Sequence, residues 1–418
     1  MKAIILAGGF GNRLKDINKD IPKPMTKICG KPVLEHQLEV LKREGIVDFI
    51  FVVGYLGYKI EEYFGDGSGF DVNISYYYEN EPLGTAGALF EIMPEEDFLL
   101  CNGDLIFDFD VKKIWNFHRE NEALATLFSH PNSHPYDSTL IVADENGLVS
   151  DFLVGKDKPK TYQNLSNAGI MIISPELLNL HSIKGKADLD RDIIMKSVGT
   201  KRIFTYKSTE YVHDMGTPER LKSVENDIKE GIVQKYHSRY LQKAIFLDRD
   251  GTINKHKGFI VHPDDIELID GVAEAINNFH KLGYLVIVIT NQPVIARGDC
   301  TEQTLKEIHN RLEMLLGKEG AYLDGIYYCP HHPDKGFDGE VEELKKACNC
   351  RKPAPGLILK ACDDFNIDLS ASYMVGDSRA DVEAGKNAGC TPIYIGEDVY
   401  GFCDSFGSLR EFSEYRLR

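Results

Sequence analysis

Short apolar runs and helical periodicity alternate along the first part of the chain. Three runs have the length and composition of buried strands, at residues 2–7, 49–53 and 98–101. Between the first two, four apolar residues recur at the spacing of one helix face: Val33, Leu34, Leu38 and Leu41. Because strands and helices alternate, the pattern predicts an α/β fold with a mostly parallel sheet flanked by helices.

This alternation stops in a charged helical stretch at residues 217–240 and then begins again. Three strands and two helices are predicted beyond it, at residues 243–247, 285–289 and 373–375 and at residues 272–282 and 357–365. We therefore expect two α/β domains, at residues 1–235 and 243–400, each with its own mostly parallel sheet.

Composition indicates the compartment of the protein, the state of its cysteines and the partners that it can bind. The chain has 418 residues, 43% of them hydrophobic, and no apolar stretch nears the roughly 20 residues of a membrane span. Its first residues lack the long apolar core of a signal peptide, so we expect a cytoplasmic protein.

Nine cysteines, an odd number, favour reduced thiols over a disulfide framework. The net charge of −17 repels polyanions, which argues against nucleic acid or an anionic membrane as a partner. Whether the chain forms a homo-oligomer stays open.

A glycine-rich turn directly follows the first predicted strand. It carries three glycines and one arginine, Gly8, Gly9, Gly11 and Arg13. Glycines at the end of a strand let backbone N–H groups approach a phosphate closely, and an arginine adds a cation with two parallel donors. An ordinary glycine-rich turn is the alternative, because short glycine motifs often match by chance.

Three further segments carry residues suited to a phosphate, a base or a metal. Lys23 stands between two prolines, which stiffen the backbone around a lone cation. Gly84 and Thr85 lie in a loop of small residues ahead of a helix, where a flat base can lie against the backbone. Asp104 follows the strand at residues 98–101, and open α/β sheets bind ligands at the carboxyl ends of their strands. The structural alternatives are, in turn, an ordinary turn, a helix start and an N-cap.

In order and spacing these segments resemble the sugar-1-phosphate nucleotidyltransferase family, over about the first 220 residues. The resemblance implies a Rossmann-like fold and Mg²⁺ held by Asp104 and Asp214. It assigns the other residues to the substrates: Gly8, Gly9, Gly11 and Arg13 to the triphosphate, Lys23 to the α-phosphate, Gly84 and Thr85 to the base, and Lys158, Asn167 and Gly169 to the sugar phosphate. The chain departs from the family's usual residues at Asn12, where Thr is common, and at Asp157, where Glu is common.

Such a reaction needs no general base, because the sugar phosphate is already an anionic nucleophile. The enzyme has to align that nucleophile with the α-phosphorus and offset the gathering charge. Mg²⁺, Arg13 and Lys23 can do so, and pyrophosphate is the second product.

The strand at residues 243–247 leads directly into Asp248 and Asp250, whose side chains point the same way on an extended chain. Both carboxylates can therefore reach one phosphate, one as nucleophile and the other as acid and base. A calcium loop also begins with this spacing of aspartates, but its glycine would be misplaced here. Further polar residues follow in order along the chain: Thr290, Asn291, Arg351, Lys352 and Asp377.

This set resembles the haloacid dehalogenase superfamily of phosphatases over roughly residues 243–396. The resemblance implies that Asp248 forms an aspartyl-phosphate and that Asp250 protonates the leaving oxygen and then activates water. It assigns Mg²⁺ to the carboxylates of Asp248 and Asp377 and to the Asp250 carbonyl, and the phosphoryl group to Thr290 and Lys352. The Lys352 ammonium also favours the ionised nucleophile.

A loop near residue 340 offers three thiolates and one imidazole, Cys329, His331, Cys348 and Cys350. These are the ligands of a closed structural Zn²⁺ site. His332 competes with His331 for one place, and buried thiols without a metal are the alternative.

This loop and the segments around Asn291 and Arg297 resemble one branch of the haloacid dehalogenase superfamily, which contains heptose-bisphosphate and histidinol-phosphate phosphatases. The resemblance makes Asn291, Arg297 and Arg351 expected substrate contacts. Pro293 and Val294 stand where the heptose enzymes usually have Ser and Gly.

The two resemblances imply successive reactions. A phosphatase that removes the 7-phosphate of D-glycero-D-manno-heptose 1,7-bisphosphate yields heptose 1-phosphate, which a guanylyltransferase can join to GMP from GTP. We therefore expect a bifunctional enzyme that makes GDP-heptose for surface glycans such as lipopolysaccharide, capsule or S-layer.

Two alternatives are a mannose-1-phosphate guanylyltransferase joined to a histidinol-phosphate phosphatase, and an N-terminal domain that only senses nucleotide. The presence of Arg13, Lys23, Asp104 and Asp214 argues against the second.

Overall fold

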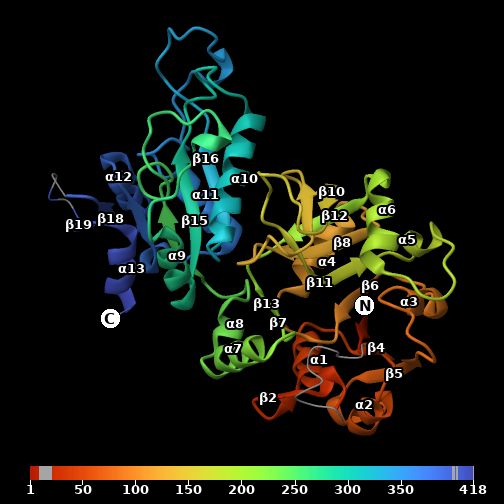
Figure 1. Cartoon of the computed structure of the whole chain (residues 1–418). Helices are drawn as coiled ribbons and strands as arrows, with labels where there is room; N and C mark the ends of the chain where they lie inside the picture. The colour runs from red at the N-terminus through yellow and green to blue at the C-terminus, as the bar shows by residue number, and fades with distance from the viewer. Residues whose placement is uncertain (9–20, 398–400, 402, 418) are drawn as a thin grey trace. The chain divides into compact units, whose positions relative to one another are not determined.

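A computed structural model describes residues 1–8, 21–397, 401 and 403–417 (Figure 1). The contacts along the chain group it into two units, and each is described by itself. The first unit comprises residues 1–130, 141–152 and 167–237, and the second comprises residues 131–140, 153–166 and 238–418.

The first unit is built on a nine-stranded sheet with a parallel centre. In that centre, β1 (Lys2–Leu6) pairs in parallel with both β4 (Asp48–Val53) and β6 (Phe98–Asn102), and β4 pairs in parallel with β5 (Asn73–Tyr78). β11 (Ser166–Ile173) then pairs antiparallel with β6. The predicted parallel sheet is thus confirmed at its centre, while the antiparallel extension is an addition that the sequence pattern did not indicate.

The main path of this sheet runs β10-β9-β11-β6-β1-β4-β5, with β8 paired to β11 and β12 paired to β8. Its other strands are β8 (Ala125–His130), β9 (Leu140–Ala143), β10 (Val149–Leu153) and β12 (Ile203–Lys207). Two small ribbons complete the strands of this unit: β2 (Lys27–Ile28) with β3 (Lys31–Pro32), and β7 (Leu105–Asp108) with β13 (Tyr211–Asp214). The helices are α1 (Val33–Arg43), α2 (Gly57–Phe64), α3 (Gly87–Ile92), α4 (Val111–Glu120), α5 (Pro175–Asn179), α6 (Met195–Ser197), α7 (Pro218–Lys229) and α8 (Ile232–Lys235).

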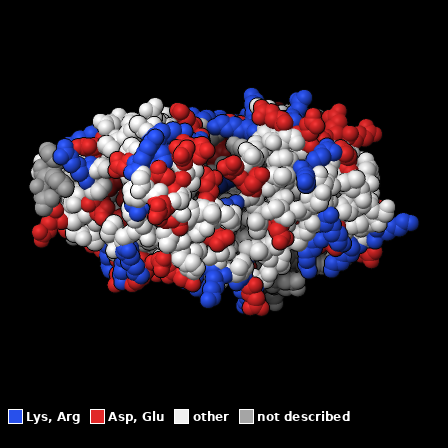
Figure 2. All heavy atoms as spheres, turned by 90° about the horizontal axis from the view of Figure 1, so that it is seen from above, with Lys and Arg blue, Asp and Glu red and all other residues white. Residues whose placement is uncertain are grey.

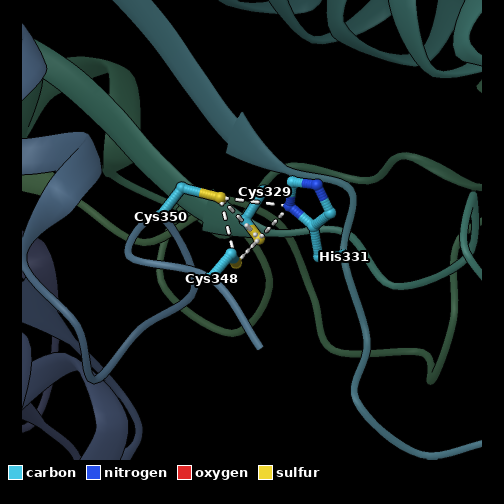
Figure 3. A group of neighbouring side chains, drawn as sticks. All are labelled: Cys329, His331, Cys348 and Cys350. Carbon is cyan, nitrogen blue, oxygen red and sulfur yellow. Dashed lines mark hydrogen bonds between the residues drawn. The ribbon is translucent and has the colours of Figure 1, made fainter. Parts of the chain in front are cut away.

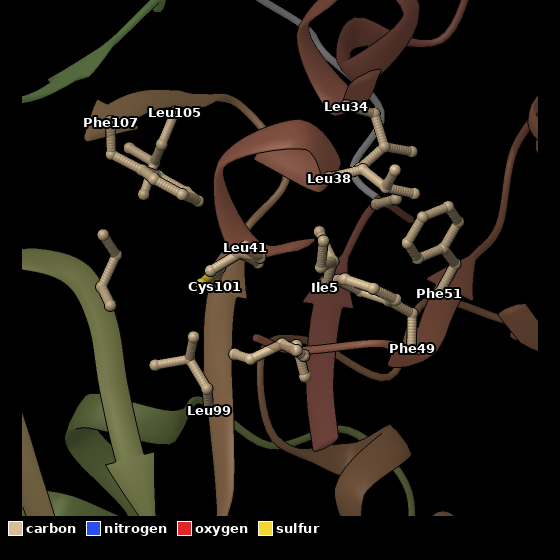
Figure 4. Close-up of a cluster of buried hydrophobic side chains, with 14 of the residues drawn as sticks. Ile5, Leu34, Leu38, Leu41, Phe49, Phe51, Leu99, Cys101, Leu105 and Phe107 are labelled. Carbon is tan, nitrogen blue, oxygen red and sulfur yellow. The ribbon is translucent and has the colours of Figure 1, made fainter. Parts of the chain in front are cut away.

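Helix α1 shows how the sequence pattern becomes a core. It begins after Pro32 and ends in Lys42 and Arg43, basic residues that suit the negative end of a helix dipole. Its predicted apolar face is buried against the ends of β1, β4 and β6 (Figure 4), with Leu34, Leu38 and Leu41 in the core. Burying each of these side chains stabilises the fold by about 2 kcal/mol.

The second unit has a six-stranded parallel sheet in the order β16-β15-β14-β17-β18-β19. Its strands are β14 (Lys243–Leu247), β15 (Tyr284–Asn291), β16 (Gly325–Cys329), β17 (Tyr373–Gly376), β18 (Thr391–Ile395) and β19 (Asp404–Phe406). Its helices are α9 (Val272–Lys281), α10 (Glu302–Lys318), α11 (Gly356–Phe365), α12 (Arg379–Ala388) and α13 (Leu409–Leu417). The strands and helices predicted here are confirmed to within a few residues at each end.

Helices α9 and α13 pack together on one face of this sheet (Figure 1). Phe279 of α9 and Phe412 of α13 meet with ring centres 5.5 Å apart and are both fully buried. Helix α12 packs against β17 and β18. Apolar residues occupy most positions of the central strands β14 and β15, as expected for strands that are buried on both faces.

Within the described part of the chain, no helix combines the length and the apolar character that crossing a membrane requires. Acidic and basic side chains are interspersed on the face drawn in Figure 2, although Asp and Glu outnumber Lys and Arg by 65 to 48 in the whole chain. Binding of an anionic substrate therefore depends on local groups of cations.

Candidate active sites

The first candidate site lies at the carboxyl edge of the second unit's sheet. Asp248 directly follows β14, Thr290 and Asn291 end β15, and Asp377 directly follows β17. These three strands are neighbours and parallel, so their carboxyl ends meet at one edge. The fold thereby brings together residues that are up to 129 positions apart in the sequence, from Asp248 to Asp377.

Asp248 is paired with Lys352. The Lys352 ammonium donates to Asp248 Oδ1 at 2.7 Å and to the Ile289 carbonyl at 2.7 Å, and it lies 2.6 Å from Asp381 Oδ1. Burial raises the pKa of Asp248, and the charge of Lys352 acts in the opposite direction. The lysine therefore favours the ionised carboxylate that a nucleophile needs.

Three carboxylates of this edge could hold a divalent cation. Asp248, Asp377 and Asp381 each offer an oxygen, and these atoms lie within 4.8 Å of one another. Gly251, with a φ of +89°, leaves room for this group, since a Cβ there would lie 1.9 Å from Asp377 Oδ2. A set of carboxylate oxygens is what Mg²⁺ prefers, so the donor set fits the predicted metal.

The carboxylate of Asp250 is paired with a buried arginine. Arg249 is fully buried, donates to both carboxylate oxygens of Asp250, and reaches Oδ2 at 2.8 Å. Gln292 and Asn254 donate to the same carboxylate at 2.9 and 3.0 Å. Burial alone would raise the pKa of Asp250, but the Arg249 charge and these hydrogen bonds hold it below its ordinary value.

His309 completes this network. Burial lowers the pKa of His309 to about 3, so the ring is neutral and its Nε2 can accept from Arg249 Nη1 at 3.3 Å. The arginine is thus satisfied on several sides, as a buried charge must be.

The remaining predicted contacts of this site have defined positions. Asn291 clamps the backbone of Lys352, accepting from its N–H at 3.0 Å and donating to its carbonyl at 3.1 Å. The Thr290 hydroxyl is buried and accepts from Gln292 at 2.9 Å. Arg351 donates to the His331 carbonyl at 3.2 Å, which joins it to the cysteine-rich loop.

That loop brings three thiols and an imidazole together (Figure 3). The sulfurs of Cys329, Cys348 and Cys350 lie 3.2 to 3.5 Å apart, and His331 Nδ1 lies 3.2 Å from the Cys350 sulfur. Four such ligands around zinc at about 2.3 Å would have their sulfurs about 3.8 Å apart, so the group is close to the geometry of a tetrahedral site. His332 instead accepts from the Asp334 N–H at 3.2 Å, and the arrangement favours His331 as the fourth ligand.

Zinc content tests this assignment. We expect protein purified without chelator to carry about one zinc per chain, because three thiols and one imidazole form a full ligand set for a structural zinc ion. Replacing Cys348 and Cys350 with Ala should remove that zinc and expose the loop to proteolysis, whereas the matched variant Cys362→Ala, in α11, should keep it. Metal analysis by mass spectrometry gives the result, and zinc-free native protein would contradict the assignment.

The second candidate site lies in the first unit, where β7 pairs with β13. Asp104 sits in the turn between β6 and β7, and Asp214 at the end of β13 is paired with Leu105, the next residue after Asp104. The Lys23 ammonium forms an ion pair with Asp104, across 81 residues of sequence. The structure therefore brings three of the predicted residues, Lys23, Asp104 and Asp214, together beyond the carboxyl end of β6 in the nine-stranded sheet.

Asp214 has a cation partner that the sequence analysis did not identify. Arg220, in the first turn of α7, donates to both carboxylate oxygens of Asp214 at 2.8 and 2.6 Å. Burial raises the pKa of Asp214, but the bonds from Arg220 and Gly216 outweigh burial and hold it below its ordinary value. Asp214 is therefore an ionised carboxylate, which suits its predicted role as a Mg²⁺ ligand.

The glycine-rich turn is described only as far as Gly8. A Cβ at Gly8 would lie 2.3 Å from Glu79 Oε2, so the absence of a side chain there admits a carboxylate at the end of β5. The other residues predicted for the triphosphate, Gly9, Gly11 and Arg13, lie outside the described residues, as does Asn12.

The loop predicted to face the base is attached to a distant segment. Gly84 has a φ of +77°, and a Cβ there would lie 2.3 Å from the Ala187 carbonyl oxygen. Thr85 accepts from the Leu189 N–H at 2.7 Å. Backbone packing therefore explains the glycine at position 84, and the base contact stays a prediction.

Two of the three residues predicted for the sugar phosphate, Asn167 and Gly169, are hydrogen-bonded neighbours. Asn167 accepts from the Gly169 N–H at 3.0 Å and donates to Asp190 at 3.2 Å. Burial raises the pKa of Asp190, a carboxylate that the sequence analysis did not single out. Lys158 lies in a segment that groups with the second unit, and its ammonium donates to the carbonyls of Tyr136 and Gly155.

Two protein families match the chain, over stretches that overlap at residues 188–231. The profile of the nucleotidyl transferase family matches residues 2–231, and that of the haloacid dehalogenase-like hydrolases matches residues 188–389. A D-glycero-beta-D-manno-heptose-1,7-bisphosphate 7-phosphatase of Escherichia coli is 48% identical over 145 residues, which are 35% of this chain and 74% of that protein. The protein of the same name from Pasteurella multocida is 44% identical over 149 residues, which are 35% of this chain and 78% of that protein.

Two solved structures are similar to parts of the chain. HddC from Yersinia pseudotuberculosis, complexed with GMP-PN, is 25% identical with a TM-score of 0.47, and the match covers 54% of this chain and 99% of HddC. A D,D-heptose 1.7-bisphosphate phosphatase from B. bronchiseptica, complexed with magnesium and phosphate, is 30% identical with a TM-score of 0.37, and the match covers 42% of this chain and 98% of that one.

Proposed function

Because the chain belongs to the nucleotidyl transferase family and also carries a haloacid dehalogenase-like phosphatase, we propose that it performs two successive steps of GDP-heptose synthesis. The phosphatase takes the 7-phosphate from D-glycero-D-manno-heptose 1,7-bisphosphate. The transferase then joins heptose 1-phosphate to GMP from GTP and releases pyrophosphate. One observation carries the proposal. Relatives of the phosphatase are named for a sugar bisphosphate, and removing one phosphate from it leaves a sugar phosphate. Sugar phosphates are the class of substrate expected for the nucleotidyl transferase unit.

In the phosphatase unit, Asp248 is the proposed nucleophile. One of its oxygens attacks phosphorus, the bond from phosphorus to the sugar oxygen breaks, and Asp250 gives that oxygen a proton. An entering phosphate dianion favours the protonated form of Asp250 by charge repulsion, and Arg249 stabilises the carboxylate that remains once Asp250 has given its proton to the sugar oxygen. The ionised Asp250 then accepts a proton from the water that hydrolyses the aspartyl-phosphate.

The other residues of this site bind and orient the phosphoryl group. Lys352 neutralises one of its oxygens, and Thr290 supplies a hydroxyl. Asp248, Asp377 and Asp381 would hold Mg²⁺, which when bound offsets the charge of the phosphoryl oxygens. The hydroxyl of Thr252 is buried and has no hydrogen-bond partner among the described residues, which leaves it for the phosphate.

In the transferase unit, Lys23 is proposed to neutralise charge on the α-phosphate, and Asp104 with Asp214 would hold Mg²⁺. GTP is the proposed nucleotide, because the motifs of this unit resemble those of guanylyltransferases.

A substrate panel tests the proposed function. Purified protein with Mg²⁺ should release pyrophosphate fastest with GTP and heptose 1-phosphate, among four NTPs and a set of sugar 1-phosphates that includes mannose 1-phosphate. It should release orthophosphate faster from heptose 1,7-bisphosphate than from histidinol phosphate. A preference for mannose 1-phosphate and histidinol phosphate would instead support the alternative pair of activities.

A further inference from the structure

Arg297 is clamped between two aromatic rings of the second unit. Its guanidinium carbon lies 4.5 Å from the ring centre of Phe259 and 4.3 Å from that of Phe337. Cations are attracted to the faces of aromatic rings at such distances. Nε of Arg297 donates to Asp299 at 2.8 Å, and within the described part of the chain its two terminal nitrogens donate to no residue. Those nitrogens are left for a ligand.

The topology places this group at the catalytic edge. Phe259 belongs to the segment after β14, Arg297 to the segment after β15 and Phe337 to the segment after β16. These strands are parallel neighbours in the sheet, so all three segments leave it at the edge where Asp248 lies. Phe259 is 54% exposed, which puts the clamp at the rim of the site.

The loop that carries the zinc ligands also carries half of the clamp. Phe337 lies between His331 and Cys348 in sequence, and two backbone contacts attach its loop to the turn of Arg297. The Val341 N–H donates to the Ala296 carbonyl at 3.0 Å. Gly298 has a φ of +77°, and a Cβ there would lie 2.0 Å from the Gly339 carbonyl oxygen.

A second cation supports Phe337. The Lys345 ammonium lies 4.4 Å from the Phe337 ring centre and 3.4 Å from Glu340 Oε2, and the side chain is fully buried. Arg297, Phe337 and Lys345 are therefore three neighbours in one packed group, and the position of the ring is fixed from within its own loop.

A hollow beside the clamp has room for part of a ligand. Its volume is about 690 Å³, in the range of small-molecule sites, and residues of all three segments line it, including Val261, Ile295, Asp299, Gly339, Val341 and Leu344. A cation held at the border of such a hollow can bind the far end of a substrate that has its reacting phosphate at Asp248.

We propose that Phe259 and Phe337 are positioning residues that hold Arg297 for the phosphate which stays on the sugar, so that the zinc loop makes the phosphatase selective for a bisphosphate. The inference rests on the proposed heptose bisphosphate phosphatase activity. The physical reason is preorganisation, since an arginine already fixed between two rings loses less conformational freedom when it binds phosphate.

Substitutions of Phe337 in the full chain test the clamp. Phe337→Ala and Phe337→Leu should each raise KM for heptose 1,7-bisphosphate about tenfold and change kcat less than about twofold, because cation–π contacts of this kind are worth about one factor of ten. Phe337→Tyr, which keeps a ring face, should stay near the wild type. With p-nitrophenyl phosphate, which has no second phosphate, KM should be the same in all three variants and in the wild type.

The leucine variant is the matched control, because it keeps the bulk of the side chain but has no aromatic face. An unchanged KM in Phe337→Leu, or an equal rise in KM for p-nitrophenyl phosphate, would overturn the clamp. In a double variant, Arg297→Ala should leave Phe337→Ala with little further effect, and multiplicative effects would also contradict coupling. A wild type that hydrolyses p-nitrophenyl phosphate but not heptose 1,7-bisphosphate would refute the proposed function itself.

Discussion

Replacing Asp248 with Asn is expected to abolish orthophosphate release, by at least about four orders of magnitude, because an amide has no anionic oxygen to attack phosphorus. The substitution keeps the shape of the side chain, so the edge formed by Lys352, Asp377 and Asp381 should persist. Stopped assays of phosphate release from heptose 1,7-bisphosphate measure the loss.

The transferase provides the control for this variant. Asp248→Asn should convert GTP and authentic heptose 1-phosphate to nucleotide sugar at the wild-type rate, because Lys23, Asp104 and Asp214, the residues proposed to act on the triphosphate and Mg²⁺, lie in the other unit. Residual phosphatase activity within tenfold of the wild type would mean that Asp248 is not the nucleophile.

Replacing Lys23 with Ala should lower nucleotidyl transfer at least about a hundredfold, because a cation at the α-phosphate acts on charge that grows in the transition state. Asp104→Ala should cause a loss of similar size, since it removes one of the two proposed Mg²⁺ carboxylates. Pyrophosphate release with GTP and heptose 1-phosphate is the measurement, and phosphatase activity should be unchanged in both variants.

A matched control lies close by in the sequence. Lys27→Ala removes an exposed lysine of β2, four residues from Lys23, and should leave transfer within about twofold of the wild type. If Lys23→Ala behaves like Lys27→Ala, the contact with the α-phosphate has to be assigned to another residue.

The parts of the sites that the sequence predicted are those attached to strand ends. Asp248, Thr290, Asp377 and Asp104 follow apolar runs that are easily recognised, and parallel strands bring such positions to one edge whatever the details of packing. The ligand set of the cysteine-rich loop was accessible for another reason, because ligands of a zinc site are close in sequence and chemically distinctive.

The sequence analysis did not single out Asp381 as a candidate metal ligand, because its sequence context is also that of a residue that caps a helix. Ser378 and Asp381 form a capping box at the start of α12, with Asp381 Oδ2 accepting from the Ser378 N–H at 3.0 Å and from its hydroxyl at 2.6 Å. The other oxygen faces Lys352. One carboxylate thus contacts both its own helix start and Lys352, and only the fold reveals the second contact.

Some contacts were missed because the residues that make them are far apart in sequence. Gly84 meets the backbone of Ala187, and Arg249 reaches Gln292 and His309. Likewise, the antiparallel pairing of β11 with β6 joins segments about 70 residues apart. Hydrophobic periodicity carries no information on such contacts, whereas it does specify each element's own buried face.

One reaction mixture tests the central claim, that the two units act in sequence on one sugar. Wild-type protein given heptose 1,7-bisphosphate, GTP and Mg²⁺ should form GDP-heptose with one orthophosphate and one pyrophosphate per product. Asp248→Asn in the same mixture should leave the bisphosphate unreacted, because a second dianion in a sugar pocket without a matching cation is costly to desolvate. If that variant instead forms a nucleotide sugar that still carries the 7-phosphate, the order of phosphatase before transferase is wrong.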